Sequence, residues 1–131
     1  MSMKKVSAST QAGEHTYLNF HIACLKRGLL IAKPVVDYCY DVIVHNLTTN
    51  DMWRVQVKKA GKKVVRDRTY WVGATHRPRG TRYPPGLIQR FAFEKPDGNG
   101  FWILDGKRFD GKAGRGLTDK DWERWDLFDL K

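Results

Sequence analysis

Two β-rich stretches, residues 41–45 and 53–58, constrain the fold of this chain most strongly. The first opens with Asp41 and is rich in β-branched residues, and about seven polar residues separate it from the second, a spacing that suits an antiparallel hairpin. Successive side chains of a strand point to opposite faces, so Gln56 and Lys58 share one face while the neighbouring valines share the other. The pattern predicts that an acid, an amide and an amine converge on one point.

The flanking segments predict a single mixed α/β domain over residues 1–131, with a central mixed β-sheet flanked by helices. Apolar side chains at mixed three- and four-residue spacings predict a helix over residues 12–29 that ends near Gly28, with Glu14 buried near its start. A chain of 131 residues can bury one core but is too short for two comfortable domains. Further strands are expected at 30–36, 63–66, 69–72, 87–94 and 100–104, and a short helix is expected after Thr118.

The connections between these elements are marked by small, polar and turn-forming residues. We expect a flexible start over residues 1–10, a turn at residues 60–62 and a long basic loop over residues 73–86, which proline and glycine interrupt. The apolar 87–104 hairpin and the tryptophan-bearing tail are candidate interfaces with a second copy.

The charge of the chain favours a polyanionic partner. Lys and Arg number 24 against 14 Asp and Glu, which gives a formal net charge of +10. The segment 119–129 is acidic, so the positive excess is concentrated before it. This asymmetry favours nucleic acid as the partner, against the alternative that the charge serves solubility alone.

Several other classes of protein are disfavoured by the sequence. No stretch approaches the roughly 18 apolar residues of a membrane span, and the first residues lack the features of a secretion signal, so an intracellular, cytoplasmic location without membrane association is expected. Cys24 and Cys39 lack metal-ligand spacing and are expected to be ordinary buried thiols in a reducing compartment. The four scattered histidines form no zinc signature.

Glu14, Asp41 and the run Gln56-Val57-Lys58 together resemble the motif of the PD-(D/E)XK nuclease superfamily. The resemblance covers roughly the first half of the chain. It is greatest for the small stand-alone branch that contains archaeal Holliday-junction resolvases and a group I intron homing endonuclease, where glutamine replaces the second acid. It implies a restriction-endonuclease-like core and hydrolysis of DNA phosphodiester bonds.

The resemblance also implies a role for each residue of the motif. Asp41 and Glu14 would hold Mg²⁺ or Mn²⁺, together with the backbone carbonyl of Val57, and Gln56 is an uncertain further ligand. Lys58 would orient the attacking water and offset charge on the phosphate. Gln56 departs from the commoner acidic pattern and removes one negative charge, which leaves open the number of metal ions and whether the site has decayed into a binding surface.

Basic side chains that follow the motif are the candidate contacts to double-stranded DNA. They are Lys59, Lys62, Lys63, Arg66, Arg68, Arg77, Arg79 and Arg82, with Arg90 on the strand beyond. Three interleaved aromatic residues, Tyr70, Trp71 and Tyr83, would stack on bases or, in the favoured interpretation, pack in the core.

The leading interpretation is a site-specific homing or mobile-element endonuclease. Because one small site cuts one strand of a duplex, we expect a homodimer or homotetramer. A Holliday-junction resolvase, a non-catalytic nucleic-acid-binding module and an RNA-binding basic protein are the alternatives.

Overall fold

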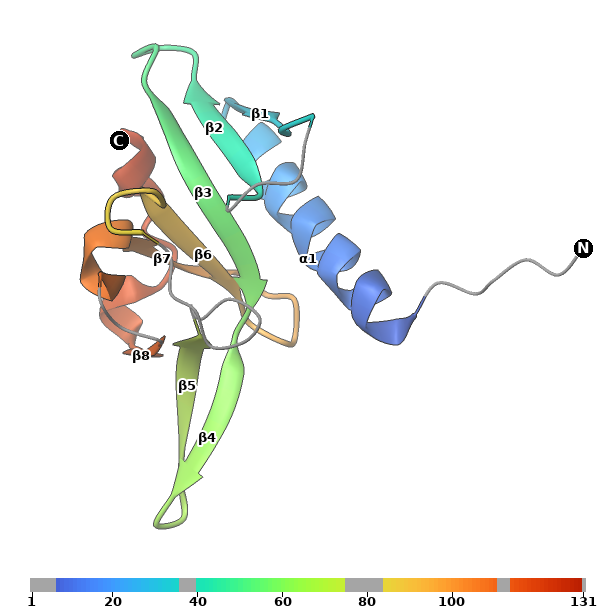
Figure 1. Ribbon diagram of the computed structural model, residues 1–131, viewed down its shortest axis with the longest axis vertical. Helices are drawn as coiled ribbons and strands as arrows, with labels where there is room; N and C mark the ends of the chain where they lie inside the picture. Colours follow the sequence, from blue (N-terminus) through green and yellow to red (C-terminus); the bar gives the residue numbers. More distant parts are fainter. Residues whose placement is uncertain (1–6, 36–39, 75–83, 111–113, 131) are drawn as a thin grey trace, which may run out of the picture.

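The predicted hairpin lies at the centre of a five-stranded sheet with the order β1-β2-β3-β6-β7 (Figure 1). We describe a computed structural model over residues 7–35, 40–74, 84–110 and 114–130. The strands of this sheet are β1 (Leu29–Ala32), β2 (Val42–Asn46), β3 (Met52–Lys59), β6 (Arg90–Glu94) and β7 (Phe101–Asp105). β3 and β6 run parallel and the other neighbours run antiparallel, which confirms a single α/β domain with a mixed sheet.

The β2–β3 hairpin follows the sequence pattern closely. The two strands pair with Val42 opposite Val55, so Asp41 lies just outside the ladder beside Gln56. Asn46 closes the connection, because its side-chain oxygen accepts hydrogen bonds from the backbone N–H groups of Thr48 and Thr49 at 2.9 and 3.2 Å. Its side-chain nitrogen donates to the backbone oxygen of Phe128 at 2.8 Å, which ties the hairpin to the end of the chain.

Alternation along the strands gives the sheet two apolar faces and two clusters of buried side chains. On β6 and β7, one cluster contains Ala92, Phe101 and Ile103. The other contains the alternate residues Phe91, Phe93, Trp102 and Leu104. The first cluster includes Phe20 and Cys24 of the helix together with the C-terminal aromatics, and burial raises the pKa of the Cys24 thiol to about 12. The core therefore lies on both sides of the sheet, with the helix covering one face.

The helix α1 (Ala8–Leu25) begins four residues before the predicted start at residue 12. Residues 8–10, expected to be flexible, are helical, and Glu14 consequently lies in the second turn. Contrary to expectation, Glu14 is exposed. Short polar side chains at the start of a helix give a weak sequence signal, which explains the misplaced boundary.

A buried carboxylate of β6 fixes how α1 sits on the sheet. Glu94 is 2% exposed, and its two carboxylate oxygens accept hydrogen bonds from the Thr16 hydroxyl at 2.9 Å and from the Asn19 amide at 2.6 Å. Buried carboxylates are costly unless they are paired in this way. The two bonds set the rotation of α1 about its axis and hence the direction in which Glu14 points.

A second, three-stranded sheet has the order β4-β5-β8 and comprises β4 (Gly61–Val65), β5 (Arg68–Ala74) and β8 (Gly114–Leu117). The single residue Ala60 separates β3 from β4, so the turn predicted at 60–62 is wrong, because Gly61 pairs with Val72 as an ordinary strand residue. The chain reverses instead at Arg66 and Asp67, whose φ angles of 51° and 65° form the left-handed turn that joins two strands tightly. Gly73 and Ala74 belong to β5 rather than to the expected loop, and residues 75–83 lie outside the described residues.

The C-terminal segment forms several short 3-10 helices, where one short helix was expected after Thr118. They are η2 (Gly106–Phe109), η3 (Asp119–Asp121) and η4 (Trp125–Phe128). Thr118 and Asp121 form a capping box at the start of η3. In η4, Trp125 and Phe128 are three residues apart, the spacing that puts both on one side of a 3-10 turn, and both are buried.

The two predicted interfaces are instead parts of the core. The aromatic residues of the 87–104 hairpin are buried in one or other cluster, and the tail packs Trp125 against Phe20 with ring centroids 5.8 Å apart. Neither segment is a free apolar surface of the protein. Within the described residues, no helix combines the length and apolar character needed to cross a membrane.

Candidate functional site

Four of the five motif residues predicted from the sequence line one pocket between α1 and the ends of the central strands. The pocket has a volume of about 260 Å³ and is lined by Gly13, Glu14, Tyr17, Lys33, Asp41, Gln56 and Val57. The helix supplies the first three, the end of β1 supplies Lys33, and the hairpin supplies the rest. Residues far apart in the sequence are thus brought to one place.

Asp41 is held in the pocket by the strand beside it. Its Oδ2 accepts a hydrogen bond from the backbone N–H of Val57 at 2.8 Å, and its own backbone N–H donates to the carbonyl of Val55 at 3.0 Å. The carboxylate is therefore fixed next to Gln56 by backbone groups rather than by a flexible side chain. An oxygen held in this way is suited to bind a cation or a water.

Gln56 carries an unusual buried oxygen. The residue is 8% exposed, and its Oε1 has no hydrogen-bond partner among the described residues. Leaving a buried acceptor unsatisfied costs about 1–3 kcal/mol. Gln56 also lines the pocket that two carboxylates line, so a ligand is a candidate for the missing partner.

Glu14 shares the pocket with a lysine that the sequence pattern did not single out. The Glu14 carboxylate and the Lys33 ammonium are 3.9 Å apart, and the same ammonium lies 4.1 Å from the centroid of the Tyr17 ring. About half of each charged side chain is exposed, so the pair contributes little to stability. Only the tertiary fold brings Lys33 to the site, because in sequence it is one lysine after a short strand.

Lys58 is not among the residues that line the pocket, but it is coupled to it electrostatically. Burial lowers the pKa of the Lys58 ammonium, and the negative charge of Asp41 partly opposes that shift. Lys58 and Gln56 stand opposite Phe93 and Phe91 of β6, as expected for side chains two apart on one strand. A partly buried lysine with a lowered pKa is typical of sites that handle protons.

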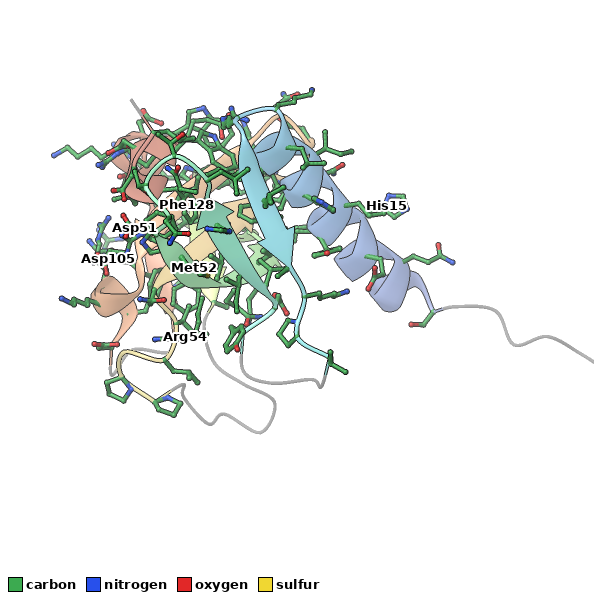
Figure 2. All side chains as sticks on the ribbon, turned by 90° about the horizontal axis from the view of Figure 1, so that it is seen from above. His15, Asp51, Met52, Arg54, Asp105 and Phe128 are labelled. Atoms are coloured by element: carbon green, nitrogen blue, oxygen red, sulfur yellow. The ribbon has the colours of Figure 1, made fainter. Side chains whose placement is uncertain are left out.

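The side chains of the pocket-lining residues include two carboxylates, one amide and the phenol of Tyr17. Within the described part of the chain, no group of three or more His, Cys, Asp or Glu side chains is close enough to hold a metal ion. His15 is exposed and points away from the sheet (Figure 2). Carboxylate and amide oxygens are hard groups of the kind that Mg²⁺ and Mn²⁺ prefer, and Glu14, Asp41 and Gln56 are the residues of the pocket that could offer them.

Comparison with solved structures finds a similar chain. The fold resembles that of a bacterial homing endonuclease. The neighbour, I-Ssp6803I, matches with a TM-score of 0.69 and 18% sequence identity, over 95% of this chain and 88% of that one. No protein-family model and no curated protein matches the sequence. The similarity therefore establishes the fold.

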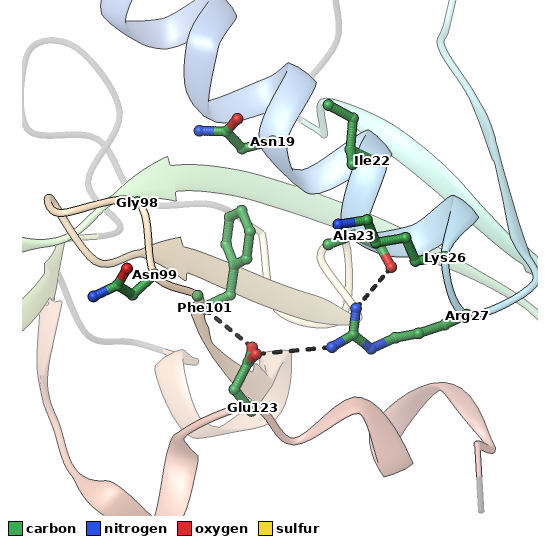
Figure 3. Close-up of a pocket in the computed structure, with 10 residues that line it drawn as sticks. Asn19, Ile22, Ala23, Lys26, Arg27, Gly98, Asn99, Phe101 and Glu123 are labelled. Carbon is green, nitrogen blue, oxygen red and sulfur yellow. Dashed lines mark hydrogen bonds and ion pairs between the residues drawn. The ribbon is translucent and has the colours of Figure 1, made fainter.

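A second pocket, of about 310 Å³, lies between the C-terminal half of α1 and the β6–β7 turn (Figure 3). Its most prominent cation, Arg27, is already engaged in the fold. The guanidinium donates to the Ala23 carbonyl at 2.8 Å, lies 3.8 Å from the Glu123 carboxylate and stacks 4.1 Å from the centroid of the Trp125 ring. These contacts hold the tail against the helix.

The predicted DNA-contacting side chains fall into two groups. Lys59 at the end of β3 and the basic residues of the β4–β5 hairpin are exposed, namely Lys62, Lys63, Arg66 and Arg68. Arg77, Arg79, Arg82 and the aromatic Tyr83 lie outside the described residues. Arg90 is engaged within the fold instead, because its guanidinium donates to the backbone oxygen of Leu127 at 3.0 Å and pairs with Asp105.

Proposed function

We propose that this protein is a metal-dependent endonuclease that hydrolyses phosphodiester bonds of double-stranded DNA, of the homing or mobile-element kind. The observation that carries the proposal is the pocket that Glu14, Asp41 and Gln56 line, together with the buried Gln56 oxygen that has no partner among the described residues. The fold shared with a homing endonuclease and the net charge of +10 support it.

The residues of the pocket would divide the chemistry between them. Glu14, Asp41, Gln56 and the carbonyl of Val57 would hold Mg²⁺ or Mn²⁺, which supplies charge neutralisation at the phosphate and lowers the pKa of a bound water. Asp41 keeps its position through the Val57 N–H. Lys58, whose pKa is lowered by burial, orients the attacking water and holds its proton.

Lys33 adds a positive charge at the mouth of the same pocket. Its ammonium lies 3.9 Å from the Glu14 carboxylate and so offsets part of the negative charge of the pocket. Its exposed position makes it a candidate contact for a DNA phosphate. Its pairing with Glu14 also lowers the expected affinity for a divalent ion.

Two features favour a second candidate function, a non-catalytic DNA-binding module. Gln56 is neutral where an acid is commoner, and Lys33 pairs with Glu14. Both features weaken a cation site without weakening a basic DNA-binding surface. On this alternative, duplex binding depends on salt but not on metal, and no condition yields cleavage.

A cleavage assay separates these functions. The protein is incubated with linear duplex of mixed sequence and with a synthetic four-way junction, each with Mg²⁺, with Mn²⁺ and with a chelator. Discrete double-strand cuts that require the metal support the proposal, and nicks confined to the junction indicate a resolvase. If the protein binds both substrates but cleaves neither under any of these conditions, the non-catalytic DNA-binding module is the function that remains.

We propose that the active form is a homodimer or homotetramer, because each chain has one such pocket and a duplex has two strands. The exposed apolar stripe of α1 is the candidate interface. Leu18, Ile22 and Leu25 are 49%, 52% and 51% exposed, and their spacing places them along one side of the helix. Figure 2 shows α1 at the outer edge of the protein.

A further inference from the structure

The β4–β5 hairpin is a projecting ribbon without a core of its own. It extends away from the larger sheet and from α1 (Figure 1), and every residue from Gly61 to Tyr70 is exposed. A two-stranded ribbon whose side chains are all exposed is only marginally stable in water. Its side chains are therefore available to a partner.

Strand register sorts the side chains of the ribbon onto two faces. Residues directly opposite each other in an antiparallel pair share a face. Lys62 pairs with Trp71, and Trp71 packs on Trp102 of the core with ring centroids 5.6 Å apart, so this is the inner face. The inner face continues toward the tip with Val64 and Thr69.

The outer face of the ribbon combines positive charge with apolar surface. It consists of the pairs Lys63–Tyr70 and Val65–Arg68. Val65 is 42% exposed and Tyr70 is 47% exposed. Four basic residues and one acidic residue occur between positions 61 and 70, so the whole ribbon attracts an anionic partner.

We infer that the outer face of the β4–β5 ribbon enters the major groove of duplex DNA and reads base edges there. Lys62 on the inner face and Arg66 in the turn at the tip would contact phosphates. The major groove admits a two-stranded ribbon, and its edges offer both guanine acceptors for Arg or Lys and the thymine methyl group for apolar side chains. The five residues of β4 span about 17 Å, which exceeds the groove depth of about 8.5 Å.

A second copy of the chain fits the ribbon less well than DNA does. β4 is an edge strand of its sheet, the position at which strands of different copies could pair. Two of its five residues are lysines, and charged side chains on an edge strand oppose such pairing. The same lysines favour a polyanion.

The connection to β3 predicts where the recognised bases lie, and this step rests on the proposed function. Lys58 on β3 and Val65 on β4 are seven positions apart in the sequence, and only Ala60 separates the two strands. Seven residues of strand span at most about 23 Å, which is about seven base-pair steps of 3.4 Å. The ribbon is therefore expected to read bases within about seven base pairs of the cut.

Two double variants that carry the same substitutions on opposite faces test the inference. The outer pair is Lys63→Gln with Val65→Thr, and the inner pair is Lys62→Gln with Val64→Thr. Each removes one charge, changes one valine to threonine and retains strand-compatible side chains, so thermal denaturation is expected to match the wild type. Each protein selects bound duplexes from a randomised library, in the full-length form and at fixed salt, and the preferred bases are sequenced.

We expect the outer pair to reduce the preference for individual bases about tenfold at positions within the reach of the ribbon. The inner pair should keep the wild-type preference, although both pairs weaken binding and reduce its salt dependence alike. The inference would be overturned by equal effects of the two pairs on base preference, by an unchanged base preference in the outer pair, or by stronger competition from single-stranded RNA than from duplex.

The proposed function can fail independently. If the wild-type protein selects sequences through the outer face of the ribbon but never cleaves DNA, the inference about the ribbon stands and the proposed endonuclease function is wrong. If the protein cleaves DNA but its base preference does not depend on the outer face, the endonuclease function stands and the inference about the ribbon is wrong.

Discussion

Asp41 accepts a hydrogen bond from the backbone N–H of Val57 at 2.8 Å, so one carboxylate both joins two strands and lines the pocket. The two roles depend on different properties of the side chain. The hydrogen bond needs only an acceptor oxygen, whereas a cation needs the negative charge.

Asp41→Asn is expected to separate these roles. The amide oxygen can still accept from Val57, so the melting temperature should stay close to that of the wild type. Metal-dependent cleavage should fall by more than about 100-fold, since removing groups that merely support metal ligands already costs about 10- to 100-fold in metal affinity. Asp41→Ala should lose cleavage and also about 1–3 kcal/mol of unfolding free energy, because the Val57 N–H loses its acceptor. Wild-type cleavage by Asp41→Asn would remove Asp41 from the site.

Gln56→Met is expected to stabilise the metal-free protein by about 1 kcal/mol, because it replaces a buried oxygen without a partner by an apolar group of similar size. The same change should abolish any rise in melting temperature that Mg²⁺ produces. Gln56→Glu is the matched control, and its added charge should strengthen Mg²⁺ binding measured by calorimetry. A destabilised Gln56→Met that still responds to Mg²⁺ would show that this oxygen has another partner.

The reactivity of the Lys58 amine is expected to depend on Asp41. Asp41 favours the ammonium form, so Asp41→Asn should lower the pKa of Lys58 further and increase its neutral fraction at any pH below that pKa. Acylation of Lys58, followed by mass spectrometry between about pH 7 and pH 10, should therefore be faster in the variant, with Lys62 as the internal reference. Equal rates in both proteins would show that the two groups are not coupled.

Asp51 and Asp129 are expected to make stability depend on pH. The side-chain hydrogen bond with Asp51, followed by burial and charge repulsion, raises the pKa of Asp129. A raised carboxyl pKa contributes stability at low pH, and this contribution is lost as the pH rises through the folded-state value. Asp51→Asn should therefore raise the melting temperature near pH 7, with a difference that shrinks below about pH 4. The exposed Asp110→Asn should not show this pattern, and a pH-independent gain in Asp51→Asn would contradict the coupling.

Charges on the apolar stripe of α1 are expected to dissociate the proposed assembly. Leu18→Lys with Ile22→Lys should reduce the mass measured by light scattering to that of one chain and leave the far-ultraviolet spectrum unchanged. Leu47→Lys, at a residue that is 56% exposed in the β2–β3 turn, is the control and should keep the wild-type mass. A wild-type protein that is monomeric at micromolar concentration would contradict the proposal.

The sequence predicted the elements whose local pattern and tertiary setting agree. The β2–β3 hairpin was predicted correctly because β2 is rich in β-branched residues and because valines alternate with polar residues on β3. The turn expected at residues 60–62 was wrong because a glycine there has an ordinary strand conformation and pairs with Val72. The short helix expected after Thr118 is divided into the 3-10 helices η3 and η4, because apolar side chains three residues apart suit a 3-10 turn as well as an α-helix.

The site was predictable only where it follows the order of the motif. Glu14, Asp41, Gln56 and Val57 do line one pocket, but their assigned roles remain predictions. Lys33 was missed because its closeness to Glu14 depends on how β1 passes α1, a long-range relation without a local signal. The partnerless state of the Gln56 oxygen likewise depends on groups from several elements and cannot be seen in a linear pattern.

The single-residue junction at Ala60 couples the pocket to the ribbon through one continuous path of backbone. Adding two residues to each arm of the ribbon would preserve which side chains share a face, since strand side chains repeat every two positions, and would lengthen its reach by about 7 Å. The turn at Arg66 and Asp67 is exposed, so it leaves room for such an extension. A protein built in this way can acquire a new target by exchange of its ribbon while its hydrolytic machinery stays the same.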